Sequence, residues 1–129
     1  MEKNRPISPH LQIYAPQITS VLSITHRFTG ITLYFSAILF SAFVISASFG
    51  ETTFDLVQSL VVSWFGKTVL FCITLAIYYH VSNGIRHLFW DFGKGFDLNS
   101  VRLSGYAVLA FSLFLTAVTW VLALSTVVK

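Results

Sequence analysis

Three stretches without a charged residue constrain this chain more than any other feature. Asp, Glu, Lys and Arg are all absent from positions 28–50, 68–85 and 103–128. A helix needs roughly 20 mostly apolar residues to cross a hydrocarbon layer about 30 Å thick. Lipid-exposed backbone must also form its own hydrogen bonds, which favours helices. The sequence therefore predicts an all-α integral membrane protein with three transmembrane helices.

The composition excludes several other classes of protein. Of 129 residues, 55% are hydrophobic and 10% are charged, and the mean hydropathy is +0.75, so an ordinary soluble domain is excluded. The basic residues are spread along the chain, which argues against a nucleic-acid-binding face. A single cysteine, Cys72, cannot form an intrachain disulfide or a thiolate metal site. We expect membrane lipid, and no nucleic acid, around this chain.

We expect one membrane-anchor domain over residues 1–129. All three prolines fall within residues 1–22, and because proline breaks helices this segment should lie along the inner membrane surface. The expected helices cover about 23–49, 60–91 and 103–127. Thr19, Ser20 or Ser23 could cap the first helix. The apolar segment 56–66 either lies in the interface or extends the second helix outward, and the glycines of 93–95 follow its end.

The basic residues also predict an orientation. Six of the eight lie before the first span or around the second loop, namely Lys3, Arg5, Arg27, Arg86, Lys94 and Arg102. Lys67 and Lys129 lie on the other side, and this bias puts the N-terminus inside. Neither a signal peptide nor an Arg-rich transit peptide is recognisable. The expected location is the bacterial inner membrane, or the mitochondrial inner membrane if the chain is encoded in the organelle.

His80 is the ionisable residue that most favours a redox function. It lies six residues before Arg86, hence about 9 Å deeper along a helix. A neutral imidazole inside the apolar zone either hydrogen-bonds to a neighbour or binds a ligand, and it is a natural axial ligand for haem iron. Gly84 and His87 share its helical face. That glycine leaves room for a macrocycle or for close helix packing, and His87 could meet the haem carboxylates.

A second group of candidate residues lies at the start of the first helix. His26 is expected at the inner interface, shallower than His80, so a second axial histidine should come from another polypeptide. Ser23 and Arg27 are four residues apart and share one face. A guanidinium and a hydroxyl there suit a haem propionate or a quinone carbonyl. Arg27 could instead be only a topology marker at the headgroups.

Three motifs then point to a known family. These motifs are RPISPHLQIY at 5–14, SITHRFTG at 23–30 and HVSNGIRHLFWD at 80–91. In this order around three apolar spans, they resemble the cytochrome b subunits of succinate dehydrogenase, the larger of two membrane anchors of succinate:quinone oxidoreductase, complex II. The resemblance covers almost the whole chain.

The resemblance implies a specific role for each candidate residue. His80 would be an axial ligand of haem b, with the other ligand from the smaller membrane-anchor subunit. Ser23, Ile24 and Arg27 would line the ubiquinone site beside the iron–sulfur subunit. His26, Arg27 and His87 would face the haem propionates. Asp91, four residues after His87, could orient that imidazole or pair with a basic group.

The same resemblance implies a place in electron transport. Electrons from succinate would pass through the flavoprotein subunit and the iron–sulfur subunit to ubiquinone. The chain itself would not oxidise succinate, since it has no dinucleotide motif and no cysteine set for a cluster. Its three helices would form part of a helical bundle shared with other subunits. Two alternatives remain: a fumarate reductase anchor, or a non-redox membrane subunit in which His80 relays protons.

Overall fold

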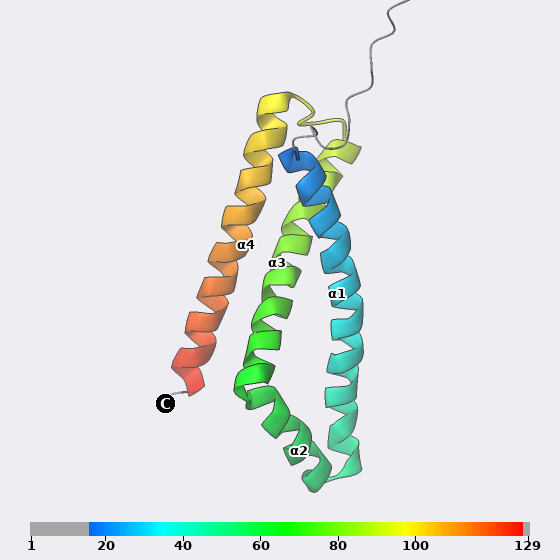
Figure 1. The fold of residues 1–129 in the computed structure, drawn as a ribbon, viewed down its shortest axis with the longest axis vertical. Coiled ribbons are helices and arrows are strands. Elements are labelled where there is room, and N and C mark those ends of the chain that lie inside the picture. Colours follow the sequence, from blue (N-terminus) through cyan, green and yellow to red (C-terminus); the bar gives the residue numbers. More distant parts are fainter. Residues whose placement is uncertain (1–15, 128–129) are drawn as a thin grey trace, which may run out of the picture.

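A computed structural model describes residues 16–127, which contain helices and no strand. The elements are α1 (Ile18–Ser46), the short 3-10 helix η2 (Ala47–Phe49), α2 (Glu51–Val62), α3 (Trp64–Asp91) and α4 (Leu98–Val127) (Figure 1). Three segments are long and apolar enough to cross a membrane: Ile18–Phe49, Trp64–Asp91 and Leu98–Thr126. The prediction of an all-α protein with three transmembrane helices is confirmed. The inside position of the N-terminus stays a prediction.

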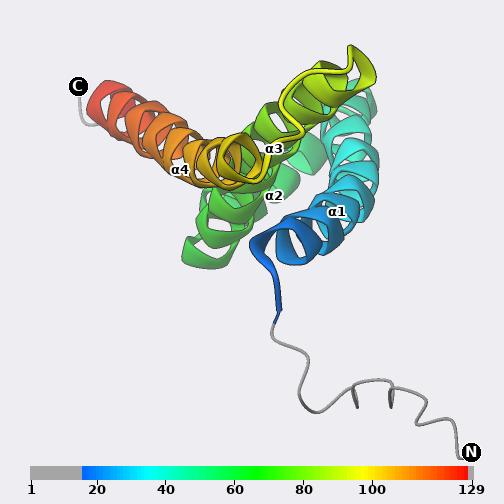
Figure 2. The same cartoon turned by 90° about the horizontal axis from the view of Figure 1, so that it is seen from above.

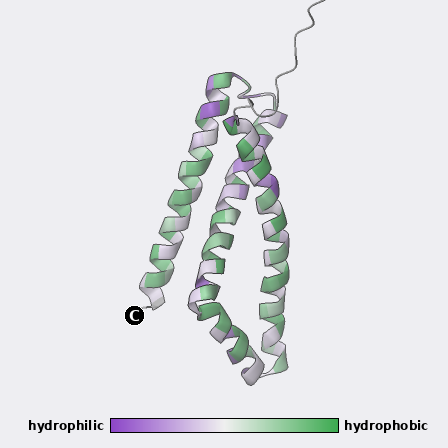
Figure 3. Ribbon diagram, viewed as in Figure 1, coloured by the Kyte–Doolittle hydropathy of each residue, from purple (hydrophilic) through white to green (hydrophobic). Residues whose placement is uncertain are grey.

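The three long helices run alternately up and down, with α3 between α1 and α4 (Figures 1 and 2). The start of α1, the end of α3 and the start of α4 therefore lie at the same end of the molecule. We call it the histidine end, because it carries the histidines described below. Hydrophobic residues follow each long helix over most of its length, and hydrophilic residues gather mainly toward the histidine end (Figure 3).

Two helices begin earlier than the sequence predicts. The first starts at Ile18 rather than 23, and Gln17 occupies the cap position without a side-chain hydrogen bond. The expected caps Thr19, Ser20 and Ser23 lie inside the helix, so that prediction is wrong. Packing decides this start, because Leu22 is buried against α3 and α4. Of the expected surface segment 1–22, residues 1–15 lie outside the described residues, and 18–22 are helical.

α4 begins at Leu98 rather than 103. The carboxylate of Asp97, just before it, accepts a hydrogen bond from the backbone N–H of Ser100 at 2.9 Å, an arrangement that stabilises the first turn of a helix.

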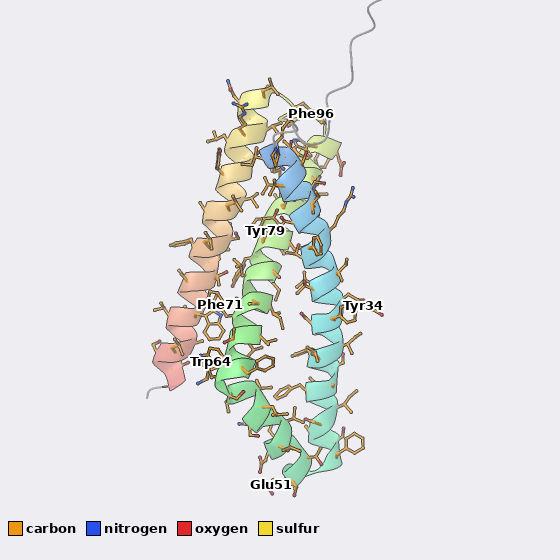
Figure 4. The ribbon with its side chains drawn as sticks, in the orientation of Figure 1. Tyr34, Glu51, Trp64, Phe71, Tyr79 and Phe96 are labelled. Carbon is orange, nitrogen blue, oxygen red and sulfur yellow. The ribbon has the colours of Figure 1, made fainter. Side chains whose placement is uncertain are left out.

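The expected second helix, 60–91, is divided at Ser63. Its extended backbone (ψ 163°) ends α2, and its hydroxyl accepts a hydrogen bond from the N–H of Gly66 at 3.1 Å, which caps α3. A Cβ on Gly66 would collide with the backbone carbonyls of Leu60 and Val61. The segment 56–66 therefore belongs to two helices. α3 begins at Trp64, an exposed side chain that is labelled in Figure 4.

Few of the described hydrophobic side chains are buried in this chain alone, and three of them pack together where α1, α3 and α4 meet. Leu22, Tyr79 and Val108 form this small core, and the Tyr79 hydroxyl donates to the Leu22 carbonyl at 2.8 Å. Gly105 lets α4 approach α1, since a Cβ there would lie 2.8 Å from Cδ1 of Leu22. The label of Tyr79 in Figure 4 marks this level.

Beyond this core, much of the apolar surface is uncovered. Large side chains such as Phe40 (68%) and Leu124 (49%) remain exposed. A cavity of about 790 Å³ also lies between the far half of α1, α2 and α3, with a lining that is almost entirely apolar. Exposed apolar surface on this scale meets lipid or other polypeptides.

Candidate functional site

Three histidines from two helices form a cluster. His26 of α1 stacks on His80 of α3, with ring centroids 4.0 Å apart and planes within 12°. The ring of His87 lies 5.3 Å from that of His26. The structure therefore brings together three of the predicted site residues. His26 lies beside Gly84, toward the histidine end, and His80 lies beside Gly30, one turn further along α1. These contacts agree with the prediction that His26 is the shallower of the two.

Thr29 determines which nitrogen of His80 carries a proton. Its hydroxyl donates to the carbonyl of His26 at 2.8 Å and also lies 3.0 Å from Nδ1 of His80. A hydroxyl has one proton to donate, and that proton is used by the carbonyl. Nδ1 of His80 must then be the donor, which leaves the lone pair of Nε2 free. This is the arrangement found in metal-ligating histidines, whose second nitrogen donates to a neighbouring group.

Asn83 fixes the tautomer of His87 in the same way. Arg86 can only donate, so the atom 3.4 Å from its Nη1 is the carbonyl oxygen of Asn83. The amide nitrogen of Asn83 then faces Nε2 of His87, also at 3.4 Å. His87 accepts this bond, so its proton is on Nδ1. Asn83 is fully buried, whereas Asp91 is exposed and forms no hydrogen bond with His87; the prediction that Asp91 orients His87 is wrong.

His26 has an unsatisfied nitrogen. Its Nδ1 is buried and has no hydrogen-bond partner among the described residues. Buried polar atoms are almost always paired, so this nitrogen points to a group that the chain alone does not supply. A neutral imidazole nitrogen donates or accepts according to its tautomer, and a haem carboxylate suits the tautomer in which Nδ1 carries the proton.

Glycines from both helices border the cluster. A Cβ on Gly30 would lie 3.3 Å from Cε1 of His80, which is a tight contact. A Cβ on Gly84 would meet Cε1 of His26 at 4.0 Å, an ordinary contact. The expectation that Gly84 leaves room for a macrocycle or for close helix packing stays a prediction, and the nearest side chain of another helix is His26. Gly30 is the glycine that gives His80 its space, and sequence reasoning missed it.

The predicted quinone residues lie on another side of α1. Arg27 and Ile24 are exposed and Ser23 is half-buried. Arg27 lies nine residues inside α1, about 14 Å from its start, and forms no ion pair or hydrogen bond with another described residue.

Sequence reasoning also missed Thr29 and Asn83. Both carry a recognisable signal, because Thr29 follows His26 by three residues and Asn83 precedes His87 by four. Polar side chains at these spacings share a helical face with a histidine. Within residues 16–127, no three His, Cys, Asp or Glu side chains are placed to hold a bare metal ion. The free Nε2 of His80 has the chemistry of an axial ligand for haem iron.

Comparison with known proteins decides the family. Residues 1–119 match the model of the succinate dehydrogenase/fumarate reductase transmembrane subunit. The chain belongs to this family. The succinate dehydrogenase cytochrome b556 subunit of Rickettsia bellii is 42% identical over 117 residues, which cover 91% of each chain. The cytochrome b560 subunit of Marchantia polymorpha is 39% identical, over 89% of this chain and 88% of its own.

An animal protein is similar as well. The mitochondrial succinate dehydrogenase cytochrome b560 subunit of Bos taurus is 42% identical over 82% of this chain and 64% of its own length. This succinate dehydrogenase/fumarate reductase transmembrane subunit is therefore a membrane subunit of the cytochrome b type. The word subunit in these names implies a complex with other chains. Its three apolar helices and its relatives fit a bacterial or mitochondrial inner membrane.

Proposed function

We propose that this chain is the anchor subunit that binds haem b and ubiquinone in a succinate dehydrogenase. The observation that carries the proposal is the hydrogen bond between Thr29 and Nδ1 of His80 at 3.0 Å. It leaves Nε2 available for haem iron, in a segment that spans the membrane. Haem b, when bound, supplies a one-electron redox centre.

His80 would be the only axial ligand from this chain. His26 stacks face to face on His80, so no iron fits between their ring nitrogens, and His87 belongs to the same helix as His80. The second axial histidine would come from the smaller membrane-anchor subunit. The buried Nδ1 of His26 would donate to a haem propionate, and His87 and Arg27 would complete the propionate site. Charge-assisted hydrogen bonds of this kind are strong and short.

Ser23, Ile24 and Arg27 would form this chain's part of the ubiquinone site. The exposed guanidinium of Arg27 has donors for a quinone carbonyl, and its fixed charge stabilises negative charge that develops there on reduction. Ser23 adds a hydroxyl on the same face, and Ile24 adds apolar contact with the quinone ring. Electrons would reach this site from the flavoprotein subunit through the iron–sulfur subunit. The proposed location is a bacterial inner membrane, or the mitochondrial inner membrane if the chain is encoded in the organelle.

The test is a reduced-minus-oxidised visible spectrum of the purified complex, comparing wild type with His80→Ala. The expected result is a low-spin b-type signal that His80→Ala abolishes or alters and His87→Ala retains. Arg27→Gln should raise KM for ubiquinone and leave succinate oxidation by artificial acceptors unchanged. A complete wild-type complex without a haem signal would overturn the haem assignment and favour a non-redox subunit in which His80 relays protons.

The family description also covers fumarate reductases, which run the same redox couple in reverse. Rates of succinate oxidation and fumarate reduction, measured on one preparation with matched quinones, distinguish the two directions.

A further inference from the structure

A second candidate site lies on the α4 side of α3, away from the histidine cluster. A cavity of about 460 Å³ opens between the end of α3 and the first half of α4. Its polar lining combines two cations with hydroxyl groups, and apolar side chains line the rest. The lining includes Arg86, Lys94, Ser104, Val108 and Phe111. We call this cavity the α3–α4 groove.

Arg86 brings a buried positive charge to the groove. It is 5% exposed, and its guanidinium donates to the Ser104 hydroxyl at 2.9 Å and to the Val101 carbonyl at 3.0 Å. The guanidinium carbon also lies 4.1 Å from the centre of the Trp90 ring. None of the described residues pairs it with a carboxylate. A buried charge without a counterion is costly, so the groove favours an anion.

Lys94 adds a second cation at a fixed place. The N–H of Gly93 donates to the Trp90 carbonyl at 2.8 Å, and that of Lys94 donates to the Phe89 carbonyl at 3.0 Å. This pair of bonds is a Schellman motif at the end of α3. Gly93 and Gly95 adopt positive φ angles of 71° and 78°, a conformation that suits glycine. The loop therefore holds the backbone of Lys94 at the groove.

The order of cationic and apolar side chains along the groove indicates the kind of ligand that fits it. The two cations lie at the histidine end of the groove, where α3 ends and α4 begins. Val108 and Phe111 continue the groove along α4 toward the membrane interior, and no carboxylate from residues 16–127 lines it. An anionic head with an apolar chain matches this order, whereas a free phosphate would use only the polar part.

We propose that the α3–α4 groove binds one anionic phospholipid. The phosphate lies against Arg86 and Lys94, with Ser104 nearby, and an acyl chain follows Val108 and Phe111. Basic pockets between transmembrane helices bind anionic headgroups by the same electrostatics. The proposal does not depend on haem or quinone binding, since the groove shares no residue with those sites.

The experiment measures lipid binding to the detergent-purified complex by native mass spectrometry. The probes are dioleoylphosphatidylglycerol, dioleoylphosphatidylcholine and inorganic phosphate, each added to delipidated wild type, Lys94→Gln and Lys67→Gln. Lys67→Gln is the matched control, because Lys67 is a lysine at the opposite end of α3. Loss of one lysine at a headgroup is worth about 1 kcal/mol, hence about fivefold in affinity.

The expected result is one bound phosphatidylglycerol whose affinity falls about fivefold in Lys94→Gln and is unchanged in Lys67→Gln. Ala107→Phe, which fills the apolar part of the groove, should also weaken binding. Equal binding of phosphatidylcholine, equal loss in both lysine variants, or displacement of the lipid by millimolar phosphate would each overturn the proposal. The last outcome would assign the groove to a free anion.

Discussion

Replacing Thr29 by valine removes one hydroxyl group and keeps the branched shape of the side chain. The 3.0 Å contact with Nδ1 of His80 and the 2.8 Å bond to the His26 carbonyl are both lost. A hydrogen bond is worth about 1 kcal/mol net. Loss of a neighbour that orients a metal-ligating histidine lowers affinity by about 10- to 100-fold. We expect haem affinity to fall about tenfold in Thr29→Val.

The assay measures haem occupancy of the purified complex at limiting haem, together with the midpoint potential of the bound haem. Thr32→Val is the matched control, since the Thr32 hydroxyl donates to the Phe28 carbonyl at 3.0 Å on an exposed part of the same helix. Thr29→Ser should restore haem binding, because it restores the hydroxyl.

The reasoning would be refuted by a Thr29→Val complex whose haem affinity and midpoint potential equal those of Thr32→Val. A Thr29→Ser complex as defective as Thr29→Val would refute it too, because the branched shape of the side chain would then matter rather than the hydrogen bond.

Three further predictions test the packing around the site. Gly30→Ala places a Cβ 3.3 Å from His80 and should shift the electron paramagnetic resonance signal of the oxidised haem, whereas Gly84→Ala, at 4.0 Å from His26, should not. Tyr79→Phe loses the bond to the Leu22 carbonyl and should destabilise the chain by about 0.6 kcal/mol in detergent unfolding; Tyr34→Phe, at an exposed position, should have no effect. The backbone N–H of Ser100 holds the pKa of Asp97 below its ordinary value of 3.8. Because the folded pKa is the lower one, this stabilisation of α4 is present above pH 3.8 and is lost as pH falls through the folded pKa; an NMR titration of Asp97 that shows an ordinary pKa would contradict it.

The three spans were predictable because the length of an apolar segment can be counted from the sequence alone. The end of α3 was equally clear, since Gly93 and Gly95 favour a backbone that a helix cannot continue. The start of α1 was not, because it depends on Leu22 reaching α3 and α4. The break at Ser63 depends on a serine hydroxyl as a cap, and serine is common in apolar helices as well.

In the candidate site too, relations within one helix were predictable, whereas contacts between helices were not. Spacing within one helix correctly related His80 to His87, because the rise per residue is fixed. Spacing says nothing about how far two helices slide past each other, so the stacking of His26 on His80 could not be predicted. Thr29 belongs to α1 and His80 to α3, so their hydrogen bond depends on that relative shift. Only the packed structure shows it.

The cavity between α1, α2 and α3 has a mechanical consequence. Side-chain hydrogen bonds between α1 and α3, such as Tyr79 to Leu22 and Thr29 with His80, occur at the histidine end of the described residues. The other half of α1 faces α3 across an almost entirely apolar space of about 790 Å³. Separation of the helices there breaks no hydrogen bond between them. We therefore expect the pair to be stiffer at the histidines than at the opposite end, where lipid or a neighbouring subunit could fill the apolar space without disturbing the histidine geometry.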